Sequence, residues 1–157
     1  MFRGQRSQQQ AGFTLVELVT VIIIIAILAV VVFPRFMNTS NFSSYTLRDE
    51  FISELRKAQL LALNNQDRCF RVQVTSLSYQ LHHMPLGCTG SAFRSEQVQS
   101  LDAGAFLRLT ATASDSFNVD FDNFGRSSLG CAGDCISVIA EETLSIAIES
   151  EGYIHAN

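Results

Sequence analysis

Basic residues are scarce beyond the first twelve positions of the chain. Two of the eleven basic residues, Arg3 and Arg6, lie in that short stretch, so the rest carries nine basic against fifteen acidic residues, a net charge of −6. Lys57 is the one lysine in the sequence. A chain so acidic, without a basic patch interleaved with aromatic residues, is a poor partner for nucleic acid or for anionic lipid headgroups.

Recurrent catalytic motifs are also missing. The sequence contains no G-x-S-x-G, no H-E-x-x-H and no glycine-rich phosphate loop. His82, His83 and His155 lie on or beside expected strands, where structural roles are commoner than catalysis, and Glu141 and Glu142 are expected in a solvated turn. We therefore expect no enzyme and no cofactor, with a membrane-anchored enzyme as the alternative.

An apolar run fills residues 13–33. As a helix these 21 residues measure about 31 Å, which matches a hydrocarbon core of about 30 Å. A cleaved secretory signal is the alternative, but the run is too long, and no A-x-A-like site follows it before Pro34. Arginines flank both ends, so orientation depends on the cysteines, which belong outside a reducing cytoplasm. We expect a single membrane span with a cytoplasmic N-terminus.

The run begins at a glycine–phenylalanine junction. "MFRGQRSQQQAG" ends in Gly12, and "FTLVELVTVIIIIAILAVVVFP" begins with Phe13. With glycine, aromatic, glutamate and proline in register, some 25 residues resemble the class III signal of type IV pilins and type II secretion pseudopilins. In that family a prepilin peptidase cuts after the glycine and methylates the new N-terminal residue. The resemblance implies that residues 1–12 are a leader, that the Gly12–Phe13 bond is cleaved and that Phe13 is methylated.

The resemblance also equates Glu17 with the glutamate by which these subunits assemble. A carboxylate inside a membrane segment costs a few kcal/mol and usually has a partner. Cleavage would turn the Phe13 nitrogen into an ammonium group, and staggered packing would let Glu17 of one subunit meet that amine of the next. A snorkelling glutamate without a role is the alternative. Pro34, equated with the family's helix-bending proline, removes a backbone donor and predicts a kink, not an end, in the helix.

A second helical pattern follows the proline. Apolar residues recur on one stripe while charged residues lie largely off it, as in an amphipathic helix. The stripe consists of Leu47, Phe51, Leu55, Ala58 and Ala62. We expect the helix to continue over residues 35–65, with a weakly helical stretch at "NTSNFSS" and the stripe packed on a sheet. A groove for a partner is the alternative use of the stripe.

From residue 66 the period changes from 3.6 to 2, which predicts strands. They are expected at residues 70–75, 78–83, 105–110, 117–122, 136–140, 144–149 and 153–155, the first two as a hairpin. Residues 66–157 should thus form an antiparallel β-rich domain in an α+β chain. The resemblance implies the pilin fold, with a long kinked N-terminal helix, transmembrane over residues 13–34, packed on that sheet.

Four cysteines lie in this domain, and none forms a C-x-x-C pair. A zinc site with a neighbouring histidine is therefore disfavoured, and we expect no metal. Cys69 and Cys88 bracket the first hairpin, where a bond would enclose about 20 residues and contribute roughly 3 kcal/mol. Cys131 and Cys135 bracket "AGD", an expected tight turn. These local disulfides are favoured, and crossed pairings stay open.

Two short stretches of the sequence indicate a branch of this family. "FDNFGR" and "IESEGYI" are similar to segments of the branch that includes the type II secretion H subunit, although Ser127 stands where that branch often has proline. "RDEFISELRKAQLLALNNQ", "EGYIHAN" and "CAGDC" together resemble minor pilins of the mannose-sensitive haemagglutinin (MSHA) pilus. The implied function is a minor pilin in pilus biogenesis and surface attachment. A minor pseudopilin is the first alternative, and a tip adhesin or DNA-uptake pilin the second.

The resemblance implies partners and a location. The partners are the prepilin peptidase/N-methyltransferase, other pilin subunits through the N-terminal helix, and an inner-membrane assembly platform. The protein would sit in the bacterial inner membrane with its C-terminal domain in the periplasm, and later in a pilus at the cell surface.

Overall fold

The computed structural model describes residues 14–102 and 104–157, apart from residues 38–43. The chain divides into two compact units, residues 1–39 and 40–157. Residues 38–43, most of the stretch that is expected to be weakly helical, lie outside the described residues, so the continuation of one helix through residue 65 stays a prediction. Each unit is described below by itself.

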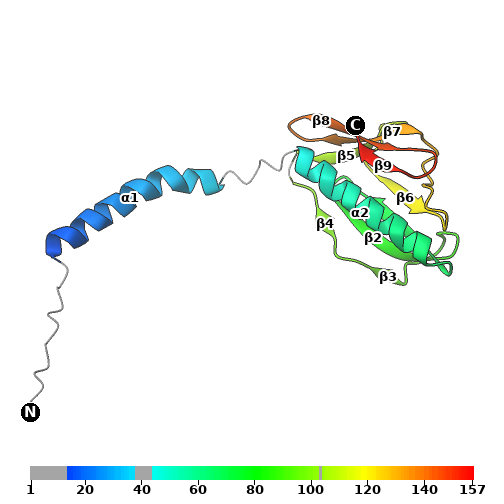
Figure 1. Cartoon of the computed structure of the whole chain (residues 1–157), viewed down its shortest axis with the longest axis horizontal. Helices are drawn as coiled ribbons and strands as arrows, with labels where there is room; N and C mark the ends of the chain where they lie inside the picture. The colour runs from blue at the N-terminus through cyan, green and yellow to red at the C-terminus, as the bar shows by residue number, and fades with distance from the viewer. Residues whose placement is uncertain (1–13, 38–43, 103) are drawn as a thin grey trace, which may run out of the picture. The chain divides into compact units, whose positions relative to one another are not determined.

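The described part of the first unit forms helix α1, Leu15–Met37, which is 23 residues long (Figure 1). The helix does not end at Pro34. Its sequence is apolar apart from Glu17, Thr20 and Arg35. In the part of the chain that the structure describes, no helix is long and apolar enough to cross a membrane. The expected transmembrane segment at residues 13–34 has no support from this finding.

The second unit begins with helix α2, Ser44–Asn64. All five residues of the predicted stripe are buried, at 3% exposure or less, which confirms its role in the core. Ser44 ties this end of the helix to the turn that contains Glu142, because its hydroxyl donates to the Glu142 carbonyl and accepts from the Glu142 N–H, both at 3.0 Å. Glu141 and Glu142 lie in an exposed turn, as expected.

Within the described residues, nine strands form two antiparallel sheets. The first sheet has the order β3-β2-β1-β6, with β4 also paired to β2. Its strands are β1 Arg68–Val74, β2 Ser78–Pro85, β3 Arg94–Ser95, β4 Gln99–Ser100 and β6 Phe117–Phe121. The second sheet has the order β5-β7-β8-β9. Its strands are β5 Phe106–Leu109, β7 Gly133–Ile139, β8 Thr143–Ile148 and β9 Ile154–Ala156.

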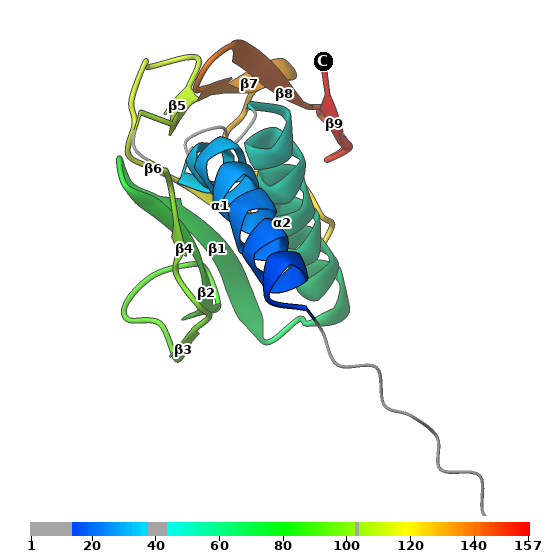
Figure 2. The ribbon, with the colours of Figure 1, turned by 90° about the vertical axis from the view of Figure 1, so that its left-hand side faces the viewer.

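One hydrophobic core joins α2 to both sheets. Phe51 and Leu55 of α2 belong to the same buried cluster as Phe70 of the first sheet and Ile136 and Ile146 of the second. Figure 2 shows β1 and β2 as one group of strands and β7 and β8 as another. The α+β class and antiparallel pairing are confirmed, but the expected single sheet is wrong. Alternation locates strands without naming their partners, and here β5 pairs with β7 instead of with β6.

The cysteines form the two local disulfides. Cys69 is bonded to Cys88 and Cys131 to Cys135, with Cα–Cα distances of 5.3 and 5.8 Å. The "AGD" segment is not the expected turn, because β7 already begins at Gly133. Asp134 pairs with Ala147 and Ile136 with Ile146, so the ladder shifts register at Cys135, as in a β-bulge.

Candidate functional site

The N-terminal end of α1 is the first candidate site. The Glu17 N–H donates to the Thr14 hydroxyl oxygen at 3.2 Å, and the Leu18 N–H donates to the Thr14 carbonyl at 3.2 Å. Thr14 is therefore the N-cap of the helix, and Glu17 occupies the position three residues on, where acids are favoured. Gly12 and Phe13 lie outside the described residues, so their expected cleavage and methylation stay predictions.

Apolar side chains cover this helix on every side. From Leu15 to Leu28, its large apolar residues are each between 44% and 78% exposed. Glu17 and Thr20 are the polar positions in this stretch, and the Thr20 hydroxyl donates to the Glu17 carbonyl at 2.9 Å. A helix that is apolar all round is typical of one buried in lipid or among other helices.

The second candidate site is a junction of two loops on α2. The Gln59 side-chain amide donates to the carbonyl oxygens of Gly125 and Gly152, both at 2.6 Å. These glycines belong to "FDNFGR" and "EGYI", the two short stretches that narrow the sequence resemblance. Both stretches do form turns, but no pattern in the sequence indicates that they meet. The one available signal was Gln59 itself, a polar residue beside the buried stripe.

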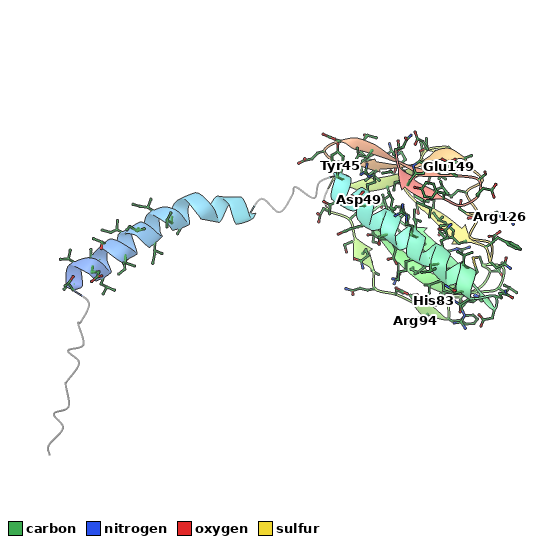
Figure 3. The ribbon with its side chains drawn as sticks, viewed as in Figure 1. Tyr45, Asp49, His83, Arg94, Arg126 and Glu149 are labelled. Atoms are coloured by element: carbon green, nitrogen blue, oxygen red, sulfur yellow. A yellow bond between two sulfur atoms is a disulfide. The ribbon has the colours of Figure 1, made fainter. Side chains whose placement is uncertain are left out.

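An aspartate organises the turn after β6. Asp122 Oδ1 accepts the N–H groups of Phe124 at 3.0 Å and Arg126 at 2.8 Å, while Oδ2 accepts the Arg126 Nε–H at 3.0 Å. Burial alone would raise the pKa of Asp122, but the hydrogen bonds from Arg126 and Phe124 bring that pKa below its ordinary value. Arg126, which Figure 3 labels, also has its guanidinium over the Phe124 ring, 5.2 Å from the ring centroid.

The three histidines do not converge on one site. His82 contacts the Ser95 hydroxyl at 2.8 Å, and His83 contacts Glu96 at 3.2 Å, both at the β2–β3 edge where Figure 3 labels His83 and Arg94. Burial, and then the charge of Arg71, lower the pKa of His82. His155 is on β9 of the other sheet.

His155 lies 3.0 Å from Glu149, which Figure 3 labels. The hydrogen bond to Glu149 is the main reason why the pKa of His155 is raised, followed by the contact with the Ala156 carbonyl. Each of the three histidines thus pairs with a near neighbour, and the geometry assembles no catalytic set from them.

One cluster has metal-ligand residue types but not their chemistry. Cys69, Cys88 and Asp120 have their potential ligand atoms within 4.8 Å of one another. The two sulfur atoms are bonded to each other, so neither is a thiolate, which is the form that binds a metal. Asp120 is engaged by Arg71, whose guanidinium donates to both carboxylate oxygens at 2.7 Å.

Comparison with known proteins gives one finding. Residues 7–33 match the family model described as the prokaryotic N-terminal methylation motif. No curated protein and no solved structure matches the chain. The motif supports a type IV pilin- or pseudopilin-like protein, and it implies processing by a prepilin peptidase and assembly with other pilins.

Proposed function

We propose that this protein is a minor pilin subunit of a type IV pilus of the MSHA type, most like MshC. One observation carries the proposal: the methylation motif at residues 7–33 leads into a helix with apolar side chains on every side, ahead of a separate α+β domain. A segment that packs among other subunits needs the motif and the apolar helix. A domain displayed on the filament needs to be a separate folded unit. The MSHA assignment depends on the shorter sequence resemblances in α2 and the two loops.

The apolar segment, residues 13–33, is stored in the inner membrane before assembly. By sequence, its 21 residues would measure about 31 Å as a helix, against a hydrocarbon core of about 30 Å. The two disulfides suit a C-terminal domain on the oxidising, periplasmic side. The assembly platform then extracts the subunit into the filament, where the helix packs among those of other subunits.

Glu17 sets the register of that packing. After cleavage its carboxylate lies four residues from the Phe13 ammonium group, about 6 Å along the helix. Both charges are costly in an apolar surrounding, and a staggered neighbour would pair each of them. The cost of the unpaired charges thus favours the assembled state.

A minor pseudopilin of a type II secretion system is the second candidate. It shares the N-terminal motif, and the joined "FDNFGR" and "EGYI" loops favour it, since both resemble the H subunit branch. A tip adhesin is a further alternative. The net charge of −6 beyond residue 12, from nine basic and fifteen acidic residues, argues against a DNA-uptake pilin.

A clean deletion separates the two candidates. The deletion strain and its complemented parent are scored together for surface pili, attachment and secreted enzymes. We expect pili and attachment to be lost while secretion continues. Lost secretion with normal pili would replace the first candidate with the pseudopilin.

A further inference from the structure

A small pocket lies between the first half of α2 and the segment that contains β4. Its volume is about 50 Å³, which holds a few water-sized groups and is too small for most organic ligands. Leu47 and Glu50 of α2, Tyr79 of β2 and residues 99–102 line it. All of its lining residues belong to the unit of residues 40–157.

Two carboxylates without partners line this pocket. Glu50 and Asp102 make neither an ion pair nor a side-chain hydrogen bond within the described residues. The nearest basic residues along α2 are engaged elsewhere, since Arg48 pairs with the next residue of the helix at 3.1 Å and Lys57 pairs with Glu96. The pocket therefore carries negative charge that the domain itself leaves unbalanced.

A buried hydroxyl group in the pocket also lacks a partner. Tyr79 is only 4% exposed, and its ring packs edge-on against the Phe51 ring, with 5.1 Å between the centroids. Its hydroxyl makes no hydrogen bond to any residue that the structure describes. Burial, followed by the charges of Glu50 and Glu54, raises the pKa of Tyr79 to about 12, so the hydroxyl is neutral at neutral pH. Buried polar groups normally have a hydrogen-bond partner, so this one indicates a group that is supplied from outside.

The size and chemistry of the pocket suit the ammonium group of a lysine. That group has three N–H donors, and the pocket offers two carboxylates and a hydroxyl oxygen as acceptors. The half-buried Leu101 borders the pocket and gives the methylene chain of a lysine apolar surface to cover. An arginine guanidinium is planar and wider than a compact ammonium group, so it fits this volume less well.

A divalent metal ion also fits less well. Calcium takes about six to eight oxygen ligands at short range. Among the described residues, the cluster of acidic, cysteine or histidine groups with its potential ligand atoms within 4.8 Å of one another is Cys69, Cys88 and Asp120, outside this pocket. The acceptors of the pocket are thus not gathered as a metal requires, whereas the three donors of an ammonium group can reach separate acceptors.

We propose that this pocket takes the side chain of a lysine on a partner protein, whose ammonium group pairs with Glu50 and Asp102 and donates to the Tyr79 hydroxyl. The partner is a different protein, because Lys57 is the one lysine in this sequence and is already paired with Glu96. The inference rests on the proposed function only for its setting, in which the partner is another subunit of the filament. Binding is measured on the chain by itself, so a negative result leaves the proposed assembly through α1 standing.

Titration of the isotope-labelled full chain by NMR, in a non-ionic maltoside detergent, tests the proposal. The probe is the capped tripeptide acetyl-Gly-Lys-Gly-amide, compared with the same peptide acetylated on the lysine side chain. We expect the lysine peptide to bind with a Kd of about 1 to 5 mM, shifting the amide signals of residues 47–50, 79 and 99–102. The acetylated peptide should bind at least about tenfold more weakly, because acetylation removes the charge.

Glu50→Gln, Asp102→Asn and Tyr79→Phe should each raise the Kd of the lysine peptide by about threefold to tenfold, the effect of one lost hydrogen bond to a charged group. Glu141→Gln and Tyr153→Phe are the matched controls, since both residues are exposed and neither lines the pocket. They should leave the Kd unchanged. Thermal unfolding shows that each variant is folded before its binding is compared.

Four outcomes overturn the proposal. The first is the absence of saturable binding by the lysine peptide, and the second is equal binding by the acetylated peptide. The third is an equal Kd for the pocket variants and the controls. The fourth is displacement of the peptide by calcium chloride below about 1 mM at matched ionic strength, which would assign the pocket to a metal ion.

Discussion

The Gln59 side chain makes a tertiary contact that a substitution at one facing glycine should disrupt. Its amide bridges the carbonyls of Gly125 and Gly152, and these two loops are held against the C-terminal half of α2. The fit is close at Gly152, where φ is +91° and a Cβ would lie 2.2 Å from the Gly125 oxygen. The obstacle is backbone, so it cannot turn aside as a side chain could.

Gly152→Ala should therefore destabilise the domain by about 2 to 4 kcal/mol, from the steric overlap added to the strain of a positive φ. Urea unfolding of the full chain, followed by circular dichroism, measures the loss. Gly130→Ala is the control, because Gly130 also has a positive φ, +62°, but has nothing within 4 Å of the added Cβ. It should lose about 1 kcal/mol. Equal losses in the two variants would show that the loop contact matters little.

At the scale of elements, β3 and β4 form a narrow strap at the edge of the first sheet. Glu96 lies between these two short strands, and its contacts hold the strap against α2 and β2. Its carboxylate pairs with Lys57 of α2 and contacts His83 of β2 at 3.2 Å, and its N–H donates to the Leu81 carbonyl at 2.9 Å. The hydrogen bond from Lys57 is the main cause that lowers the pKa of Glu96.

A carboxyl group with a lowered pKa stabilises the fold above its ordinary pKa of 4.5 and stops doing so as pH falls through the lowered value. Glu96→Gln should thus cost about 1 kcal/mol at neutral pH. The wild type should lose this advantage as pH falls below 4.5, until the two proteins unfold alike. Urea unfolding across this pH range measures the difference. Glu141→Gln, in the exposed turn before β8, should show no such convergence, and a constant gap for Glu96→Gln would contradict the ion-pair account.

The elements themselves could largely be predicted, but their partners could not. The buried stripe from Leu47 to Ala62 and seven of the strands could be predicted from the spacing of apolar residues, because burial on one face imposes that spacing. β3 and β4 were missed because each has two exposed residues and no alternation. The Gln59 junction was missed because hydrogen bonds across 66 and 93 residues leave no local pattern.

On the scale of the whole molecule, the two units differ in what they contain. The domain of residues 40–157 contains the shared core, both sheets and both disulfides. The unit of residues 1–39 holds the methylation motif and an apolar helix whose large side chains are exposed from Leu15 to Leu28. A folded domain can therefore be carried by a segment whose partners are other molecules.

The role of Glu17 tests whether the unit of residues 1–39 serves in assembly. Besides the proposed pairing with a neighbour's Phe13 amine, it has a local role open to it, since it stands in the first turn of α1 three residues after the N-cap Thr14. Glutamine serves equally well at that position of a capping box but carries no charge. Glu17→Gln and Glu17→Ala therefore distinguish the two roles.

If the charge pairs with a neighbour, both variants should enter the membrane but incorporate into filaments at least about tenfold less, because each leaves the neighbour's ammonium group unpaired. Membrane fractionation and quantification of sheared pili give the two readouts. Intact mass should show each variant without residues 1–12 and with one added methyl group, which excludes a processing defect. Normal incorporation of Glu17→Gln beside impaired Glu17→Ala would assign the residue to helix capping instead.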